Sequence, residues 1–210
     1  MQNGIKAILD VPSPIDFSKM EDAQAWADTA MKKRPFREEF FGAFVDALGM
    51  LRQHELSVLE LGSGPGFLAQ RVLQSLPETK YTMLDFSPAM HILAQERLGA
   101  LAEKVQLVIA DFKEDAWATA LPLYDAVVTM QAVHELRHKQ HALKLHTSVS
   151  ATLRKGGTYL VCDHYAAPEA MTNTDLYMTI EEQQAALQHA GFKNIKCILQ
   201  KCGLVLHTAA

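Results

Sequence analysis

The sequence is poor in cysteine and has no long apolar run, and each absence excludes a class of protein. Its 210 residues include three cysteines, Cys162, Cys197 and Cys202, and no Cys-x-x-Cys pair. An odd, scattered set of thiols indicates neither a disulfide framework nor a zinc ribbon, so we expect reduced thiols. Lys, Asp, Glu or Gln interrupts every hydrophobic segment before the ~18 apolar residues of a membrane-spanning helix are reached. The sequence therefore predicts no membrane contact.

Positive charge is also scarce. Twenty Lys and Arg stand against 24 Asp and Glu, which gives a formal net charge of -4. Nucleic-acid-binding proteins generally carry a basic surface, so no nucleic-acid partner is expected. The first residues, MQNGIKAILDVPSP, match neither a secretion signal nor an Arg-rich transit peptide. We therefore expect a cytoplasmic protein.

From residue 57 onward, short apolar runs alternate with longer stretches of helical periodicity. Five successive strands are predicted over residues 57–61, 81–85, 105–111, 124–130 and 157–163. Helices are predicted over residues 67–76, 90–101, 136–153 and 180–189, and a polar segment follows the third strand. Such alternation predicts an α/β fold, with a parallel sheet covered by helices on both faces.

The two ends of the chain depart from this alternation. The last apolar runs, 194–199 and 203–207, are separated by too few residues for a parallel crossover, so an antiparallel hairpin at the sheet edge is expected. Residues 17–31 and 37–51 are predicted to be helical. The sequence thus predicts one domain over residues 1–210, with a helical N-terminal part (1–56) and an α/β core (57–210).

A glycine-rich turn follows the first predicted strand, where open α/β sheets bind their ligands. The segment VLELGSGPG places Gly62, Gly64 and Gly66 two residues apart, with Ser63 between the first two and Glu60 two residues before Gly62. Glycines allow a sharp turn and a close approach of the backbone to a ligand. The spacing is one residue shorter than the Gly-x-Gly-x-x-Gly of dinucleotide sites.

An acidic residue ends the second predicted strand. Asp85 follows Gly62 by about 23 residues, where nucleotide sites of this kind place an acid against the ribose hydroxyls. The alternative is that Asp85 only caps the next helix, which begins with Ser87-Pro88.

These motifs, VLELGSGPG and YTMLDFSPAM, together with the closing hairpin, resemble those of class I S-adenosylmethionine-dependent methyltransferases. The resemblance covers residues 58–163 and continues more loosely to the C-terminus. It implies a Rossmann-like, seven-stranded, mostly parallel sheet with a C-terminal antiparallel hairpin and N-terminal capping helices. It also implies S-adenosylmethionine as cofactor and methyl transfer to an oxygen, nitrogen or carbon of a small molecule.

The resemblance assigns roles to several positions. Glu60 is expected beside the methionine part of the cofactor, and Asp111 and Phe112, which follow the third strand, at its adenine. Residues of the N-terminal helices are candidates to close over the cofactor, namely Trp26, Arg34, Phe36, Arg37 and Phe40. One of the two arginines would pair with the methionine carboxylate, and Arg37 is our candidate. The predicted cofactor-binding residues are Glu60, Gly62, Ser63, Gly64, Gly66, Asp85, Phe86, Met90, Asp111, Phe112, Met130, Gln131 and Arg37.

His134 is the candidate catalytic residue. It follows the fourth strand, where some small-molecule O-methyltransferases carry a His-Asp pair that His134-Glu135 resembles, although the family's neighbouring Trp is replaced by Leu136. A neutral imidazole accepts the proton of an attacking hydroxyl, and Glu135 would orient the ring. A contact with substrate or a loop hydrogen bond is the alternative role.

The same stretch, HELRH, matches the zinc-protease signature H-E-x-x-H. We expect no metal, because the motif begins at the end of a strand rather than inside a helix. In a helix beginning there, His134, His138 and His141 would face solvent, opposite Leu136 and Leu143. A zinc hydrolase is thus a remote alternative to the methyltransferase hypothesis.

Absent motifs narrow the acceptor. The [DNS]-P-P-[YFW] motif of base-methylating enzymes does not follow the fourth strand, and Cys162 is expected to be a buried structural thiol. His164 is a secondary candidate for contact with the substrate. The short connection between Asp163 and Thr179 favours a small acceptor, and the chain is expected to be a monomer or a homodimer. A non-catalytic regulatory protein that binds S-adenosylmethionine or S-adenosylhomocysteine remains the main alternative.

Overall fold

The computed structural model describes residues 8–51 and 55–210; the other positions of the predicted helical N-terminal part, 1–7 and 52–54, lie outside the described residues. In chain order the elements are α1 (Met20–Lys33), α2 (Arg37–Gly49), β1 (Ser57–Leu61), α3 (Phe67–Ser75), β2 (Lys80–Asp85), α4 (Pro88–Leu98), η1 (Gly99–Lys104), β3 (Val105–Ile109), α5 (Ala116–Ala120), β4 (Tyr124–Met130), η2 (Val133–Leu136), η3 (Lys139–His141), α6 (Ala142–Thr152), β5 (Leu153–His164), α7 (Ile180–His189), β6 (Lys196–Lys201) and β7 (Leu204–Ala209). The η elements are short 3₁₀ helices.

The strands form one seven-stranded sheet in the order β3-β2-β1-β4-β5-β7-β6. The first five pair in parallel, whereas β7 is antiparallel to both β5 and β6. The turn between the last two strands uses Cys202 and Gly203, both at positive φ. The predicted fold class, including the C-terminal hairpin, is confirmed.

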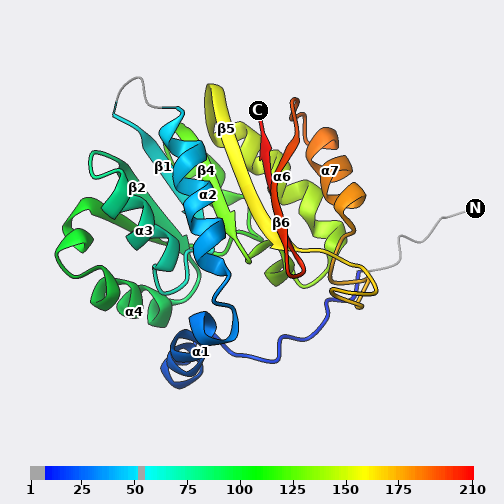
Figure 1. Cartoon of the computed structure of the whole chain (residues 1–210), viewed down its shortest axis with the longest axis horizontal. Coiled ribbons are helices and arrows are strands. Elements are labelled where there is room, and N and C mark those ends of the chain that lie inside the picture. Colours follow the sequence, from blue (N-terminus) through cyan, green and yellow to red (C-terminus); the bar gives the residue numbers. More distant parts are fainter. Residues whose placement is uncertain (1–7, 52–54) are drawn as a thin grey trace, which may run out of the picture.

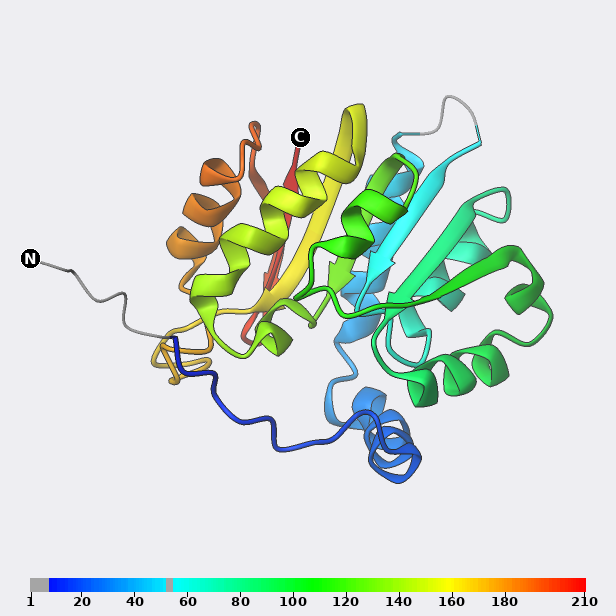
Figure 2. The same cartoon turned by 180° about the vertical axis from the view of Figure 1, so that it is seen from behind.

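Helices cover both faces of the sheet (Figures 1 and 2). Helices α2, α3 and α4 lie on one face and α5, α6 and α7 on the other. Residues that alternate along β1 divide between two apolar cores: Val58 packs with Phe40 and Phe44 of α2, and Leu59 packs with Leu145 and other residues of the opposite layer. This alternation follows from the two-residue period of a strand. Helix α2 is thus part of the main core.

Local sequence explains where several helices begin. Ser87 precedes α4, and its Oγ accepts a hydrogen bond from the backbone N of Met90, while Pro88 occupies the first helical position. Thr179 and Glu182 form a reciprocal capping box at the start of α7. None of the helices in the described ranges is long and apolar enough to cross a bilayer.

The prediction of a helix over residues 136–153 was wrong in its first part. Two 3₁₀ turns replace the helix, and α6 begins only at Ala142. The interruption is at Arg137, whose φ of 68° is left-handed, and Lys139 N then donates to the carbonyl of Asp175. The polar segment after β3 also contains a short helix, α5, anchored by the buried Trp117.

Candidate active site

A cavity of about 840 Å³ lies at the carboxyl ends of β1, β2, β4 and β5. Its volume is within the range of ligand pockets, roughly 300 to 1,000 Å³. Residues 8–19, here called the N-terminal strap, run in an extended path below this end of the sheet towards α1 (Figure 2). Residues 11–17 of the strap and several residues of α1 line the cavity. Sequence reasoning missed the strap, which has no periodic pattern.

Hydrogen bonds attach the glycine turn to the end of β2. The backbone N–H groups of Gly62 and Ser63 both donate to the carbonyl of Leu84, and that of Gly64 donates to Oδ2 of Asp85 at 2.8 Å. Gly62 has a φ of 63°, and an added Cβ would lie 2.4 Å from the Cβ of Ala132. At Gly64, with φ of 53°, a Cβ would meet no atom of the described residues within 4 Å. The absence of a side chain at Gly62 therefore allows close packing against Ala132, whereas at Gly64 it leaves open space beside the cavity.

Gly66 is placed differently from the other predicted cofactor residues. It does not line the cavity, whereas the other twelve do. Its φ is 79°, and an added Cβ would lie 3.2 Å from the Cβ of Ala94 on α4. Gly66 thus allows α3 to begin at the turn and to pack closely on α4.

Asp85 is buried at the end of β2. Its second oxygen, Oδ1, accepts from the backbone N of Ser87 at 2.9 Å. Burial raises the pKa of Asp85, and the backbone donors oppose that shift. The exposed Phe86 and the buried Met90 line the cavity beside it. This carboxylate both holds the glycine turn and borders the cavity.

Glu60 and Arg37 are two buried ionisable groups at the cavity wall. Glu60 is 2% exposed and accepts a hydrogen bond from the hydroxyl of Tyr81 at 3.0 Å; burial raises its pKa to about 8. Arg37 is 5% exposed, and burial lowers its pKa to about 10. Its Nε and Nη1 have no hydrogen-bond partner among the residues that the structure describes. The ring centroids of Trp26 and Phe67 lie 5.6 and 5.3 Å from its guanidinium carbon. A buried guanidinium with free donors suits an incoming carboxylate.

The remaining predicted cofactor residues come from the loops after β3 and β4. Asp111 is exposed and accepts from the backbone N of Lys113, while the ring of Phe112 is buried against the glycine turn. Met130 ends β4, and Gln131 follows at a φ of 57°. Oε1 of Gln131 is buried without a hydrogen-bond partner in the described ranges.

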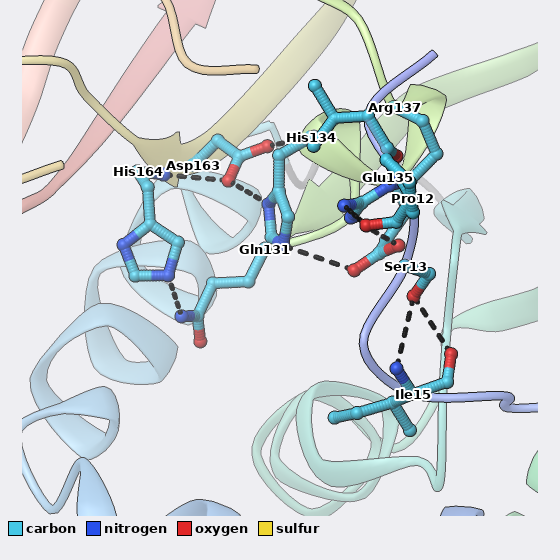
Figure 3. Close-up of polar contacts among 10 residues, drawn as sticks. Pro12, Ser13, Ile15, Gln131, His134, Glu135, Arg137, Asp163 and His164 are labelled. Atoms are coloured by element: carbon cyan, nitrogen blue, oxygen red, sulfur yellow. Dashed lines mark hydrogen bonds and ion pairs between the residues drawn. The ribbon is translucent and has the colours of Figure 1, made fainter. Parts of the chain in front are cut away.

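His134 lies between two carboxylates (Figure 3). Its Nδ1 is 2.6 Å from Oδ1 of Asp163, and its Nε2 is 3.3 Å from Oε1 of Glu135. Oε2 of Glu135 accepts from Nη1 of Arg137 at 3.2 Å. Burial acts to lower the pKa of His134, but the two carboxylates outweigh it and raise the pKa to about 10. The solvent-facing placement of His134 depended on a helix beginning there, and that helix does not form.

Asp163 is the site residue that sequence reasoning missed. It is buried at the end of β5 and accepts from Nδ1 and the backbone N of His134 and from the backbone N of His164. Glu135 was expected to orient the imidazole, but Asp163 holds its Nδ1. The position of Asp163 at a strand end, in the sequence CDH beside a candidate residue, was the available signal.

The zinc-protease arrangement does not form in HELRH. The segment is broken at Arg137, Nδ1 of His138 accepts from the backbone of Gln140, and Nε2 of His141 lies 2.9 Å from Oδ1 of Asp10. Within residues 8–51 and 55–210, no three His, Cys, Asp or Glu side chains converge as a metal site would require. The zinc-hydrolase hypothesis therefore lacks the helix on which it depends.

The N-terminal strap is attached at both ends. Near its beginning, Nε and Nη2 of Arg137 donate to the carbonyls of Val11 and Pro12, both at 2.8 Å, and Val11 N donates back to the carbonyl of Arg137. Near its end, the hydroxyl of Ser87 donates to the carbonyl of Phe17. Arg137 thus contacts both the strap and the carboxylate that faces His134.

A family model described as a methyltransferase domain matches residues 59–159. This range includes the glycine turn, the ends of β2 and β3, and His134. Residues 59–159, just under half of the chain, thus form a methyltransferase domain of the class I S-adenosylmethionine-dependent type. The methyl donor of this family is S-adenosylmethionine, the cofactor that the glycine turn predicted.

Individual relatives of this methyltransferase are distant. A malonyl-[acyl-carrier protein] O-methyltransferase of Neorickettsia risticii is 33% identical over 78 residues, 37% of this chain and 28% of the relative. A second protein of that name, from Ilyobacter polytropus, is 42% identical over 45 residues, 21% of this chain and 17% of the relative. The matched segments thus span less than a third of either curated relative.

Solved structures share the fold over almost the whole methyltransferase. An O-methyltransferase family protein from Burkholderia thailandensis has a TM-score of 0.75 at 15% identity, covering 92% of this chain and 60% of the other. Human N-acetylserotonin methyltransferase, solved with its S-adenosylmethionine, has a TM-score of 0.65 at 18% identity, covering 90% and 54%. At such identities the likeness extends to the fold alone.

Proposed function

We propose that this methyltransferase transfers the methyl group of S-adenosylmethionine to an oxygen, nitrogen or carbon of a small molecule. One observation carries the proposal: a single cavity is bordered by the glycine turn, Glu60 and Asp85 and also by His134 and His164. Donor and acceptor bound in one cavity can be held in line for displacement, which supplies much of the acceleration in such reactions.

The residues that line the cavity around the glycine turn fit the cofactor. When bound, S-adenosylmethionine supplies an electrophilic methyl carbon on a sulfonium. The free donors of Arg37 match its methionine carboxylate, and Glu60 matches its ammonium. Asp85 keeps lone pairs for the ribose hydroxyls, while Asp111 and Phe112 border the space for adenine.

The other part of the cavity suits a small acceptor. Polar groups come from His134, Gln131, His164 and Tyr177, and residues 11–17 of the N-terminal strap line the same cavity. We propose His134 as the residue that contacts the reacting atom. It accepts a proton from a neutral acceptor only when Glu135 has moved away from Nε2, because both ring nitrogens otherwise face carboxylates.

Two measurements on the purified chain test the proposal. Calorimetry should show binding of S-adenosylhomocysteine, and incubation with methyl-labelled S-adenosylmethionine and pools of small metabolites should give labelled product. Arg37→Gln should weaken the binding and the transfer together. Failure of the wild-type protein to bind S-adenosylhomocysteine would contradict the proposed site. Binding without transfer to any acceptor would instead support the non-catalytic regulatory alternative.

A further inference from the structure

The surroundings of the His134 imidazole fit its doubly protonated, cationic form. A neutral imidazole has one N–H and one lone pair, whereas here both ring nitrogens face carboxylate oxygens, at 2.6 Å from Asp163 and 3.3 Å from Glu135. Only the doubly protonated ring donates to both. In this state His134 has no lone pair with which to remove a proton, but it can donate a hydrogen bond to an acceptor that is already an anion.

Glu135 marks the position that such an anion would take. Its side chain is 25% exposed and lines the cavity, and its other oxygen is bound by Arg137 at 3.2 Å. The Glu135 carboxylate can move away from Nε2 of His134 and still be paired, because its other oxygen is bound by Arg137. An incoming carboxylate would then replace one charge-assisted contact with an equivalent one.

Arg34 adds a further cation to the lining of this cavity. It follows α1, lines the cavity, and its guanidinium makes no hydrogen bond or ion pair within the described part of the chain. Burial lowers the pKa of His164 to about 4, and the charges of His134 and Arg34 act in the same direction while Asp163 opposes them. Burial raises the pKa of Tyr177, and the Arg34 charge opposes that shift. Arg34 therefore acts on the two aromatic neighbours of His134, whose ring centroids lie 5.4 and 5.6 Å from it.

Among the charged groups around the His134 imidazole, Arg34 forms no ion pair within the described residues. His134, Arg137 and Arg34 are cations, whereas Asp163 and Glu135 are the facing anions. The methionine carboxylate of the cofactor is assigned to the buried Arg37, whose pKa is shifted by burial and by the charges of Arg34 and Glu60. One positive charge, that of Arg34, is left for the acceptor.

We propose that the acceptor carries a carboxylate, bound between Arg34 and His134, and that this carboxylate is the group methylated; the inference rests on the methyltransferase function proposed above. A carboxylate oxygen uses a lone pair to form the new O–CH₃ bond, and the S–CH₃ bond breaks with its electron pair returning to sulfur. No proton is released, so no base is required. The methyl ester is neutral and loses its attraction to both cations, which favours product release.

The test compares small carboxylic acids with their primary amides, which have nearly the same shape and no charge. Benzoate, phenylacetate, hexanoate and succinate are each paired with the corresponding amide and titrated into protein saturated with S-adenosylhomocysteine. Acids should bind at least about tenfold more tightly than amides, as expected for a charge-assisted contact. With S-adenosylmethionine in place of the product, mass spectrometry should detect the methyl ester of the acids that bind.

Arg34→Gln is the diagnostic variant, and Arg71→Gln, an exposed position on α3 that does not line the cavity, is its control. Arg34→Gln should remove the preference for acids and leave the affinity for S-adenosylhomocysteine within about twofold; the control should change neither. The inference is overturned if amides bind as tightly as acids or if no acid in the panel binds. It is also overturned if Arg34→Gln weakens the binding of S-adenosylhomocysteine and leaves the preference for acids unchanged. In each case normal binding of S-adenosylhomocysteine by the wild type would leave the methyltransferase proposal intact.

Discussion

Nδ1 of His134 lies 2.6 Å from Oδ1 of Asp163, although 29 residues separate them in the chain. Strand pairing accounts for the contact. Met130 at the end of β4 is in register with Cys162 of β5, so the loop after β4 begins beside Asp163. The buried carboxylate then accepts three hydrogen bonds, which fix both the loop and the imidazole. The sheet register, rather than the local motif, thus determines the orientation of the ring.

Asp163→Asn should lower the pKa of His134 from about 10 towards its ordinary value near 6.5. In this variant only the Glu135 carboxylate would oppose the lowering of the pKa by burial. NMR of the imidazole nitrogens measures this pKa directly. Loss of a charged hydrogen bond should also reduce kcat by roughly 10- to 100-fold. Affinity for S-adenosylhomocysteine should be unchanged.

Asp125→Asn is a matched control, because Asp125 is a partly buried carboxylate at the start of β4, bound to Ser57 and Arg154 and outside the cavity. It should leave the His134 pKa and kcat unaltered. An unchanged His134 pKa in Asp163→Asn would remove Asp163 from its assigned role.

Arg137→Gln should loosen the N-terminal strap. The variant loses the two hydrogen bonds to the carbonyls of Val11 and Pro12, each worth about 1 to 3 kcal/mol when the donor is charged. Hydrogen exchange of residues 8–19 should become faster, and S-adenosylhomocysteine should dissociate more quickly because the strap lines its cavity. Exchange in the central strands should not change.

Arg154→Gln removes an arginine that pairs with Asp125 at the other end of the sheet, and it should affect neither strap exchange nor dissociation. If both arginine variants gave the wild-type exchange pattern in residues 8–19, Arg137 would not be the attachment point of the strap.

Much of the fold and of the cofactor site was predictable, because both depend on local sequence. Strand alternation and the short final connection predicted the sheet with its hairpin, and the glycine spacing with Glu60 and Asp85 predicted the end of the sheet at which the cavity lies. Such signals depend on backbone conformation within a few residues, which the residue types constrain directly.

The features that were missed depend on contacts between distant residues. Asp163 meets His134 through sheet register, and Arg137 adopts its left-handed conformation while bound to residues more than 120 positions away. Helical periodicity around residues 136–141 gave no sign of that interruption. Tertiary contacts here override local propensity.

Glu60→Gln should stabilise the ligand-free protein at pH 8 relative to the wild type. Burial raises the pKa of Glu60 from about 4.5 to about 8, so the folded state holds this proton more tightly than the unfolded chain. The wild-type free energy of unfolding therefore falls as the pH rises from 4.5 to 8, with a slope of about 1.4 kcal/mol per pH unit. Glutamine does not titrate and still accepts from Tyr81.

Thermal unfolding at pH 5 and pH 8 measures this difference, with the exposed Glu96→Gln on α4 as control. The Tm advantage of Glu60→Gln should be large at pH 8 and small at pH 5. The same variant should bind S-adenosylhomocysteine about tenfold or more weakly, because the amide carries no charge for the ammonium. A Tm advantage of equal size at both pH values would contradict a raised pKa for Glu60.

Three glycine variants separate the needs of the fold from those of the cofactor. Gly62→Ala should reduce the free energy of unfolding by more than about 2 kcal/mol, the sum of left-handed strain and the collision with Ala132. Gly64→Ala has the same left-handed strain, of about 1 kcal/mol, without a collision among the described residues.

Gly156→Ala, in β5, matches Gly64→Ala in strain and free space, with a φ of 80°, but lies outside the cavity. Urea unfolding should therefore show similar, small losses for the variants at 64 and 156. Calorimetry should show weaker S-adenosylhomocysteine binding only for Gly64→Ala, because its methyl group enters the space beside the glycine turn. If the two variants bound S-adenosylhomocysteine equally tightly, the cofactor would not approach the backbone at Gly64.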